Sequence, residues 1–137
     1  MANNTMQMAD SAKILIVDED ILNIANISQT LVRGGFVISH ATSHERALKA
    51  VTHERPDLII CNLDAPAIDA DEFVRTVKQK AALKGIPFLF IVGAHNASTL
   101  APEILGPRQY LSIPFTREQV FAAVLEHLKH RRPHHSS

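Results

Sequence analysis

The sequence predicts an α/β domain built on a doubly wound, five-stranded parallel sheet with helices on both faces. Short apolar runs recur along the chain, and each is about as long as one buried strand. Each run is followed by a segment whose apolar residues return every three or four positions, which is the period of a helix. Gly and Pro residues separate these segments. This alternation is typical of parallel strands that are joined by right-handed helical crossovers.

Five segments have the composition of strands. The first, third and fourth are almost wholly apolar, as expected of strands that helices cover on both faces. Their greater burial indicates the flavodoxin-like strand order 2-1-3-4-5, in which the first and third strands are neighbours. The expected strands are residues 13–17, 36–40, 58–61, 87–92 and 109–112.

Helices are expected between the strands. The first should end at Gly34-Gly35, and the second should begin at Ser43 as its N-cap and reach about His53. The third is expected at about 71–83. The residues at helical spacing are Ile21, Leu22, Ala25, Ser28, Leu31 and Val32 in the first helix, and the inward-facing residues of the third are Phe73, Val74, Val77 and Ala81.

The sequence signal for a helix is weak in one of the two remaining segments and strong in the other. Residues 96–105 predict only a short or broken helix, because Pro102 cannot continue it and Gly106-Pro107 ends it. The last helix should begin after Thr116 as its N-cap. Its expected apolar face is Val120, Phe121, Val124, Leu125 and Leu128.

The size of the chain sets the number of domains. Its 137 residues, 46% of them hydrophobic, suffice for one well-buried core and are too few for two ordinary domains. We therefore expect one domain at 13–130, between a disordered leader at 1–12 and a disordered tail at 131–137. His127, His130 and the tail histidines are interpreted as a solvated end and not as a metal site.

Composition excludes several functional classes. The formal net charge is zero, so there is no general electrostatic case for binding nucleic acid or an anionic membrane. No apolar run approaches the ~20 residues that cross a bilayer, and the leader is too polar to be a signal sequence. A cytoplasmic location is expected. The single Cys61 lies within a predicted buried strand and is interpreted as a small core residue.

The candidate site lies at the carboxyl edge of the sheet, where this class of fold places its chemistry. Asp18 and Glu19 follow the first strand, and Asn62 follows the third, so the predicted strand order brings them face to face. Carboxylate and amide oxygens are hard ligands that suit Mg²⁺. The spacing equally fits acidic residues that merely favour the positive end of the next helix. The first turn has no Gly-rich loop, which argues against mononucleotide binding.

The chain from Lys13 to about His130 resembles the receiver domain of bacterial two-component response regulators, a family whose stand-alone member is the chemotaxis response regulator. The resemblance implies Mg²⁺-dependent transfer of a phosphoryl group from a histidine kinase to an aspartate at the end of the third strand. The matching motifs are Ile14-Leu15-Ile16-Val17-Asp18-Glu19, Gly35-Phe36-x-Ile38-x-x-Ala41, Pro56-Asp57-Leu58-Ile59-Ile60, Pro66-x-Ile68-Asp69 and Tyr110-Leu111-x-x-Pro114-Phe115.

The chain departs from this family where the chemistry takes place. The position of the family's acceptor aspartate is occupied by Asn62, and that of the switch hydroxyl on the fourth strand by Val92. The position of the family's lysine, before the last proline, is occupied by Ile113. An amide is not a useful nucleophile, valine has no hydroxyl, and isoleucine cannot neutralise developing charge. We therefore interpret the chain as a degenerate pseudo-receiver. Tyr110 matches the aromatic residue that moves when receivers switch.

Of the family's site, the sequence retains the residues that bind the metal ion. The resemblance implies a weak Mg²⁺ site formed by Asp18, Glu19 and the backbone carbonyl of Asp64. The predicted function is that of a non-enzymatic module that binds a signalling protein, either a histidine kinase or an output domain. The binding face would be the one that receivers generally use for output, formed by residues 96–105, the fifth strand and the last helix. A homodimer is also considered.

Two alternatives remain open from the sequence. In the first, a neighbouring carboxylate such as Asp64 accepts the phosphoryl group in place of Asn62. In the second, the chain is a small Mg²⁺-dependent phosphotransferase of the haloacid dehalogenase kind. That class needs Asp-x-Asp after a strand, and this chain reads Asn62-Leu63-Asp64.

Overall fold

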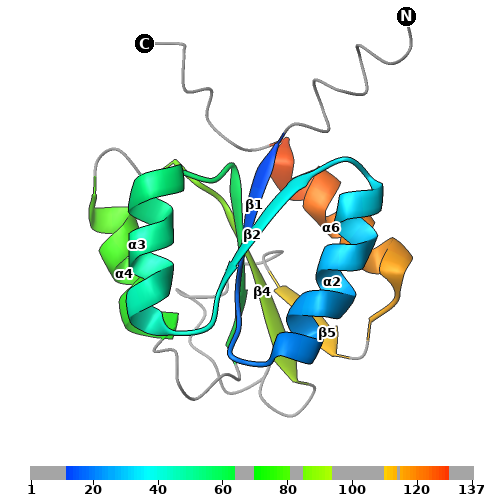
Figure 1. Cartoon of the computed structure of the whole chain (residues 1–137), viewed down its shortest axis with the longest axis horizontal. Helices are drawn as coiled ribbons and strands as arrows, with labels where there is room; N and C mark the ends of the chain where they lie inside the picture. Colours follow the sequence, from blue (N-terminus) through cyan, green and yellow to red (C-terminus); the bar gives the residue numbers. More distant parts are fainter. Residues whose placement is uncertain (1–11, 64–69, 81–84, 94–109, 114, 130–137) are drawn as a thin grey trace, which may run out of the picture.

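The computed structural model describes residues 12–63, 70–80, 85–93, 110–113 and 115–129 (Figure 1). The predicted leader and tail, Asp64, Ala81, residues 96–105 and His130 lie outside these ranges.

The described residues form a five-stranded, wholly parallel sheet in the order β2-β1-β3-β4-β5. The predicted fold class and strand order are both confirmed. Every strand falls within about one residue of its predicted bounds. The apolar runs of β1, β3 and β4 are buried over almost their whole length, whereas β2 is largely exposed or half-buried at the edge of the sheet. The strands are β1 (Lys13–Val17), β2 (Val37–Ala41), β3 (Leu58–Asn62), β4 (Phe88–Gly93) and β5 (Tyr110–Ile113).

Helices cover both faces of the sheet (Figure 1). One face carries α3 (His44–Glu54) and α4 (Ala70–Gln79), and the other carries α2 (Ile21–Arg33) and α6 (Arg117–Leu128). The third predicted helix is confirmed, but it ends at Gln79 and not near residue 83, since Lys80 is no longer helical. Both predicted N-caps are confirmed: the Ser43 hydroxyl accepts from the backbone N–H of Arg46, and Thr116 forms a reciprocal capping box with Gln119.

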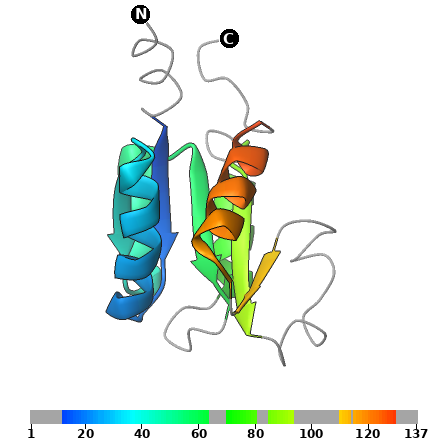
Figure 2. The ribbon, with the colours of Figure 1, turned by 90° about the vertical axis from the view of Figure 1, so that its right-hand side faces the viewer.

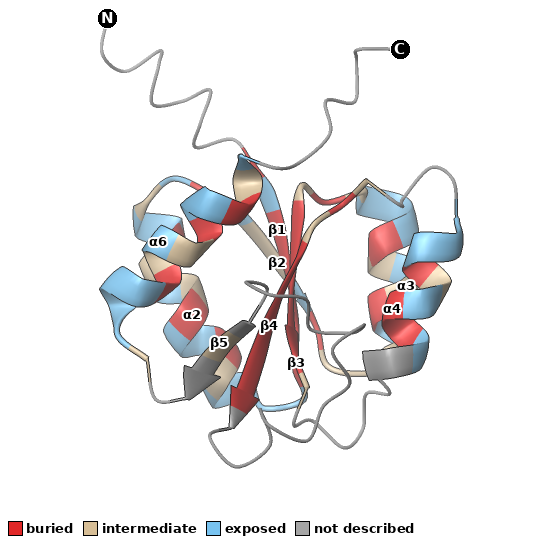
Figure 3. Ribbon diagram, turned by 180° about the vertical axis from the view of Figure 1, so that it is seen from behind, coloured by how far each residue is buried: buried red, intermediate tan, exposed pale blue. Residues whose placement is uncertain are grey.

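Each helical layer closes its own hydrophobic core (Figure 3). Successive residues of a strand point to opposite faces, so Val17, Cys61 and Val92 pack beneath α3 and α4. Their neighbours Ile16 and Ile60 pack beneath α2 and α6. The central strands are thus buried on both sides, which holds their carboxyl ends at fixed positions along one edge of the sheet.

The predicted apolar spacing of α2 does not mark its buried face. Of the predicted set Leu31 is fully buried, but Ile21, Leu22 and Val32 are exposed, and the other core residues of the helix are Ile24 and Ile27. Both sets of positions satisfy the helical period, so the period alone could not choose between them. Packing against the sheet and α6 selects the second set and leaves Ile21 and Leu22 in solvent at the carboxyl edge.

The inner face of α6 also differs from the prediction. Leu125 is 41% exposed, whereas Val120, Val124 and His127 are buried. The ring nitrogen Nδ1 of His127 lies 2.7 Å from the Ala123 carbonyl oxygen, one turn earlier on the helix. The interpretation of His127 as part of a solvated end is therefore wrong, because this hydrogen bond satisfies the ring within the packed layer.

Phe121 explains how closely α6 approaches the end of α2. Its ring contacts that of Phe36, with centroids 6.0 Å apart. A Cβ atom at Gly34 would lie 2.6 Å from Cε1 of Phe121, so only glycine leaves room for the ring. The predicted helix end at Gly34-Gly35 therefore also serves packing, while Gly35 takes the positive φ of 94° that favours glycine.

Candidate functional site

The site begins at the acidic turn between β1 and α2. Asp18 is 2% exposed, and its backbone N–H donates to the Ala41 carbonyl at 3.1 Å, which extends the pairing of β1 with β2. Its carboxylate Oδ1 accepts from the backbone N–H of Asp20 at 2.9 Å. The carboxylate is thus held beneath the turn and not released to solvent.

The other two acidic residues of the turn have different surroundings. Asp20 is the N-cap of α2, since its Oδ1 accepts from the backbone N–H of Leu22 at 2.9 Å. Glu19 is exposed between them. The interpretation that acidic residues here favour the start of the next helix therefore applies to Asp20, which the sequence analysis did not single out for that role.

The predicted meeting of Asp18 with Asn62 is confirmed by a direct hydrogen bond. The amide Nδ2 of Asn62 donates to Oδ2 of Asp18 at 2.9 Å, and Asn62 is 6% exposed. A carboxylate can only accept, so the amide must present its NH₂ group. Nδ2 of Asn23 also donates to Oδ2, at 3.3 Å.

Three N–H groups therefore solvate the buried charge of Asp18. Hydrogen bonds to an ionised group are the stronger kind. Within the ranges that the structure describes, no lysine or arginine forms an ion pair with Asp18. We call Asp18, Asn23 and Asn62 the Asp18 cluster. It is a carboxylate held by two amides.

The neighbouring thiol is unreactive. Burial, and secondly the negative charge of Asp18, raise the pKa of Cys61 to about 12. The thiol therefore stays protonated at any physiological pH, and the interpretation of Cys61 as a core residue is confirmed.

The other predicted positions lie on the strands next to Asn62. Val92 is fully buried near the end of β4 and pairs with Ser112 of β5. Ile113 ends β5 opposite Gly93, and Tyr110 begins β5 opposite Phe90. The backbone thus brings Asn62, Val92 and Ile113 to the carboxyl ends of three adjacent strands.

The family model of the response regulator receiver domain matches residues 14–125. The chain belongs to this family. Relatives include the alkaline phosphatase synthesis transcriptional regulatory protein PhoP of Bacillus subtilis, which is 30% identical over 82% of this chain and 46% of PhoP. The probable chemotaxis protein CheY of Rhizobium etli is 27% identical over 87% of this chain and 94% of that protein.

A solved structure places this receiver domain in the same fold. The chemotaxis response regulator CheY4 of Vibrio cholerae superposes with a TM-score of 0.73 and 26% identity, over 85% of this chain and 98% of CheY4. The chain spans less than half of PhoP but nearly all of the two chemotaxis proteins.

Receiver domains bind Mg²⁺ for phosphorylation, and the Asp18 cluster fits that ion poorly. Both lone pairs of Asp18 Oδ2 are already taken by amide N–H groups. No group of three His, Cys, Asp or Glu side chains in the described part of the chain could hold a metal ion. A bound ion would compete with these amides at Oδ2 or share Oδ1, which accepts only the backbone N–H of Asp20. The predicted backbone ligand, Asp64, lies outside the described residues.

No pattern in the sequence singles out Asn23. It lies five residues after Asp18, within the second turn of α2, where asparagine is an ordinary surface residue. Its donation to Asp18 depends on the rotation of α2 about its axis. That rotation was the feature of α2 that the apolar period did not determine.

No helix in the part of the chain that the structure describes is long and apolar enough to cross a membrane.

Proposed function

We propose that this receiver domain is a protein-binding module that works without phosphorylation. The observation that supports this most is the hydrogen bond from the Asn62 amide to Asp18, at the position where the family carries its phosphoacceptor aspartate. The amide nitrogen is not a nucleophile toward a phosphoryl group. Its NH₂ group also satisfies the carboxylate that would otherwise bind the metal ion. One substitution thus removes the acceptor and weakens the metal site.

Two further positions support the proposal. Val92 offers no hydroxyl to bond a phosphoryl oxygen, and it is fully buried among apolar side chains. Ile113 has no charge to neutralise a phosphoryl group. Without these groups the domain would lack both the transition-state stabilisation and the contact that pulls receivers into their active state. A partner would therefore bind the single state that the domain holds.

Weak Mg²⁺ binding belongs to the same proposal. Asp18, Glu19 and the backbone of Asp64 are the residues that would hold the ion. Because Asp18 is already satisfied by three N–H donors, the ion gains little by displacing them. When bound, the ion would supply positive charge to the acidic edge.

The proposed setting is cytoplasmic signalling, with no catalytic activity of the domain itself. The partner would be a signalling protein, such as a histidine kinase or an output domain, bound at the face formed by residues 96–105, β5 and α6. A homodimer through this domain is the alternative assembly. Of the two alternative functions, transfer to Asp64 would leave a covalent product, so mass measurement separates it from the proposal.

The proposal predicts that Mg²⁺ and a phosphodonor do not switch the domain. A ligand that does not distinguish two states cannot shift their populations. In NMR spectra recorded during titration with magnesium chloride and then acetyl phosphate, we expect shifts confined to Asp18, Glu19 and Asn62. Concerted movement of the resonances of Val92 and Tyr110 would show a working switch and overturn the proposal.

A further inference from the structure

The strand β2 forms one edge of the sheet. Figure 1 looks onto this edge, with β2 in front of β1 and the helices α3 and α2 on its two sides. The backbone N–H of Val37 donates to the Ala12 carbonyl at 3.0 Å. Because the backbone groups of a strand alternate in direction, Ile38 and His40 point their N–H and C=O groups away from β1. In the part of the chain that the structure describes, these outward groups have no hydrogen-bond partner.

The strand also lacks the features that keep edge strands from pairing with other chains. Charged side chains, prolines and bulges are the usual protections. The strand reads Val-Ile-Ser-His-Ala, and its pairing with β1 has no bulge. Val37 and His40 are exposed, and none of the side chains is that of Asp, Glu, Lys or Arg. The edge can therefore accept a further strand.

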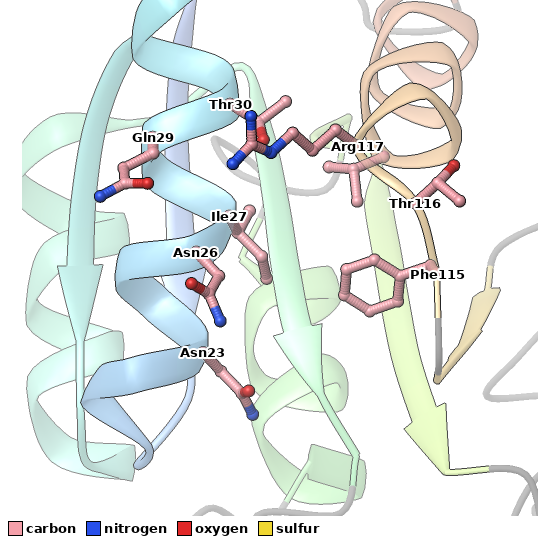
Figure 4. Close-up of a pocket in the computed structure, with 9 residues that line it drawn as sticks. Asn23, Asn26, Ile27, Gln29, Thr30, Phe115, Thr116 and Arg117 are labelled. Atoms are coloured by element: carbon pink, nitrogen blue, oxygen red, sulfur yellow. The ribbon is translucent and has the colours of Figure 1, made fainter.

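The helix α2 presents an uncharged flank beside this edge. Its flank toward α6 carries Asn23, Asn26 and Thr30, which line a groove between the two helices (Figure 4). On this face of the sheet the described helices are α2 and α6, so the opposite flank of α2 lies toward β2 (Figure 2). We call that flank the α2 stripe. With about 100° of rotation per residue, it consists of Ile21, Ala25, Ser28 and Val32.

The α2 stripe is open to solvent. Ser28 is half-buried, and the other three side chains are exposed, Ile21 to 69% and Val32 to 57%. Together with Val37 of β2, they leave several large apolar side chains exposed on one side of the molecule. Exposed apolar side chains that cluster in this way mark interaction surfaces. The stripe thus gives a role to the apolar positions of α2 that do not enter the core.

We propose that a second copy of this chain binds here, with the two β2 strands antiparallel and the two α2 stripes in contact. A twofold axis through Ser39 places Ile38 of each copy opposite His40 of the other. Residues paired in this way exchange both of their N–H···O bonds. All the outward backbone groups of Ile38 and His40 then have partners, and the two sheets become one.

A second copy fits better than an unrelated strand because one axis satisfies both surfaces. The side chain of Ile38 packs into the core beneath α2 and α6, so it lies on the same face of the sheet as the α2 stripe. An axis perpendicular to the sheet therefore sets α2 of one copy beside α2 of the other. Neither β2 nor the stripe carries a charge, so two identical surfaces can meet without repulsion. An unrelated strand would satisfy the edge alone.

The dimensions of these surfaces indicate a reversible dimer. The stripe and the strand are each about 16 Å long. The interface should therefore bury less than the roughly 800 Å² per partner of a stable complex. We expect a dissociation constant of roughly 10–100 µM. The inference goes beyond the proposed function, since neither β2 nor α2 carries Asn62, Val92 or Ile113.

Sedimentation equilibrium of the intact chain measures the assembly. The weight-average mass should rise from that of one chain toward that of two as the concentration increases from about 1 µM to about 1 mM. Hydrogen exchange measured by NMR over the same range should show the backbone amides of Ile38 and His40 becoming protected. Only pairing with another strand gives these amides an acceptor.

Variants locate the contact. Val32→Lys places like charges where the two stripes meet, and His40→Pro removes an outward N–H that the pairing of β2 with β1 does not use. Each should raise the dissociation constant at least about tenfold, because a twofold interface repeats every change. Leu125→Lys makes a matched change at an exposed position of α6 and should leave the constant unaltered. Urea unfolding checks that each variant is folded.

Several results would overturn this inference. They are the mass of a single chain throughout the concentration range, a dimer whose Ile38 and His40 amides stay unprotected, a dimer that Val32→Lys does not weaken, or one that Leu125→Lys weakens equally. None of these measurements involves a phosphodonor, so failure here is distinguishable from failure of the proposed function.

Discussion

Substitution Asn62→Asp is expected to destabilise the domain by about 2–4 kcal/mol at neutral pH without Mg²⁺. The wild-type amide donates to Oδ2 of Asp18 at 2.9 Å in a site where both residues are buried. An aspartate would replace that hydrogen bond with two carboxylates in contact, and like charges so close cannot both ionise without a cation. The restored carboxylate should therefore make stability depend on the metal.

Urea unfolding with and without millimolar magnesium chloride measures both effects. Mg²⁺ should recover much of the stability of Asn62→Asp, because a ligand that binds only the folded state stabilises it by mass action. It should change the wild type little. The control Asn26→Asp adds the same charge at an exposed position of α2, and its stability should remain within about 0.5 kcal/mol of wild type.

Exchanging the two side chains tests the pairing itself. The double variant Asp18→Asn and Asn62→Asp keeps one carboxylate and one amide in contact, so it should be more stable than Asn62→Asp alone. If Asn62→Asp proves as stable as wild type and indifferent to Mg²⁺, the amide does not hold the site in the way proposed.

Substitution Asp18→Ala is the second change expected to have a large effect, a loss of about 2–4 kcal/mol. It removes the common acceptor of three N–H groups, from Asp20, Asn23 and Asn62. Loss of the hydrogen bond from Asn62 should cost the most free energy, because it is buried. The hydrogen bonds from Asp20 and Asn23 are only partly buried, so these donors can reach water.

A double-mutant cycle separates this pair from general damage to the turn. Removing both partners, as in Asp18→Ala with Asn62→Leu, leaves no stranded amide, so the two losses should sum to more than the loss in the double variant. The free energies come from urea unfolding. Strict additivity would mean that the bond between the two side chains contributes nothing to stability.

The central strands could be predicted from the sequence because helices cover them on both faces. A run such as Leu58–Cys61 must be apolar throughout to be buried on both sides, and turn residues bound it. The helix caps were equally readable, since Ser43 and Thr116 satisfy orphan N–H groups locally. Features set within a few residues of the chain were therefore found correctly.

Features that depend on tertiary packing could not be predicted from the sequence. The rotation of α2 left Ile21 and Leu22 exposed, brought Ile24 and Ile27 into the core, and aimed Asn23 at Asp18. All three outcomes depend on how α2 packs against the sheet and α6.

Burial of His127 and the groove between α2 and α6 have the same origin. Each results from α6 docking beside α2, two helices that are distant in the sequence.

The candidate site could be predicted from the sequence only in part. Strand order and strand ends predicted that Asp18 and Asn62 would meet, because parallel strands present their carboxyl ends at one edge. The direction of the hydrogen bond could not be read from the sequence. Asn62 is the donor to Asp18, so a neutral amide satisfies the buried carboxylate at this edge of the sheet.

The intact mass of the protein after incubation with acetyl phosphate and Mg²⁺ tests the central claim most directly. The wild-type mass should stay unchanged, because Asn62 cannot form an acyl phosphate and Val92 and Ile113 cannot assist transfer. The triple variant Asn62→Asp, Val92→Thr and Ile113→Lys restores these groups and should gain one phosphoryl group. A gain of one phosphoryl group by the wild type, mapped to Asp64 or Asp69, would contradict the account.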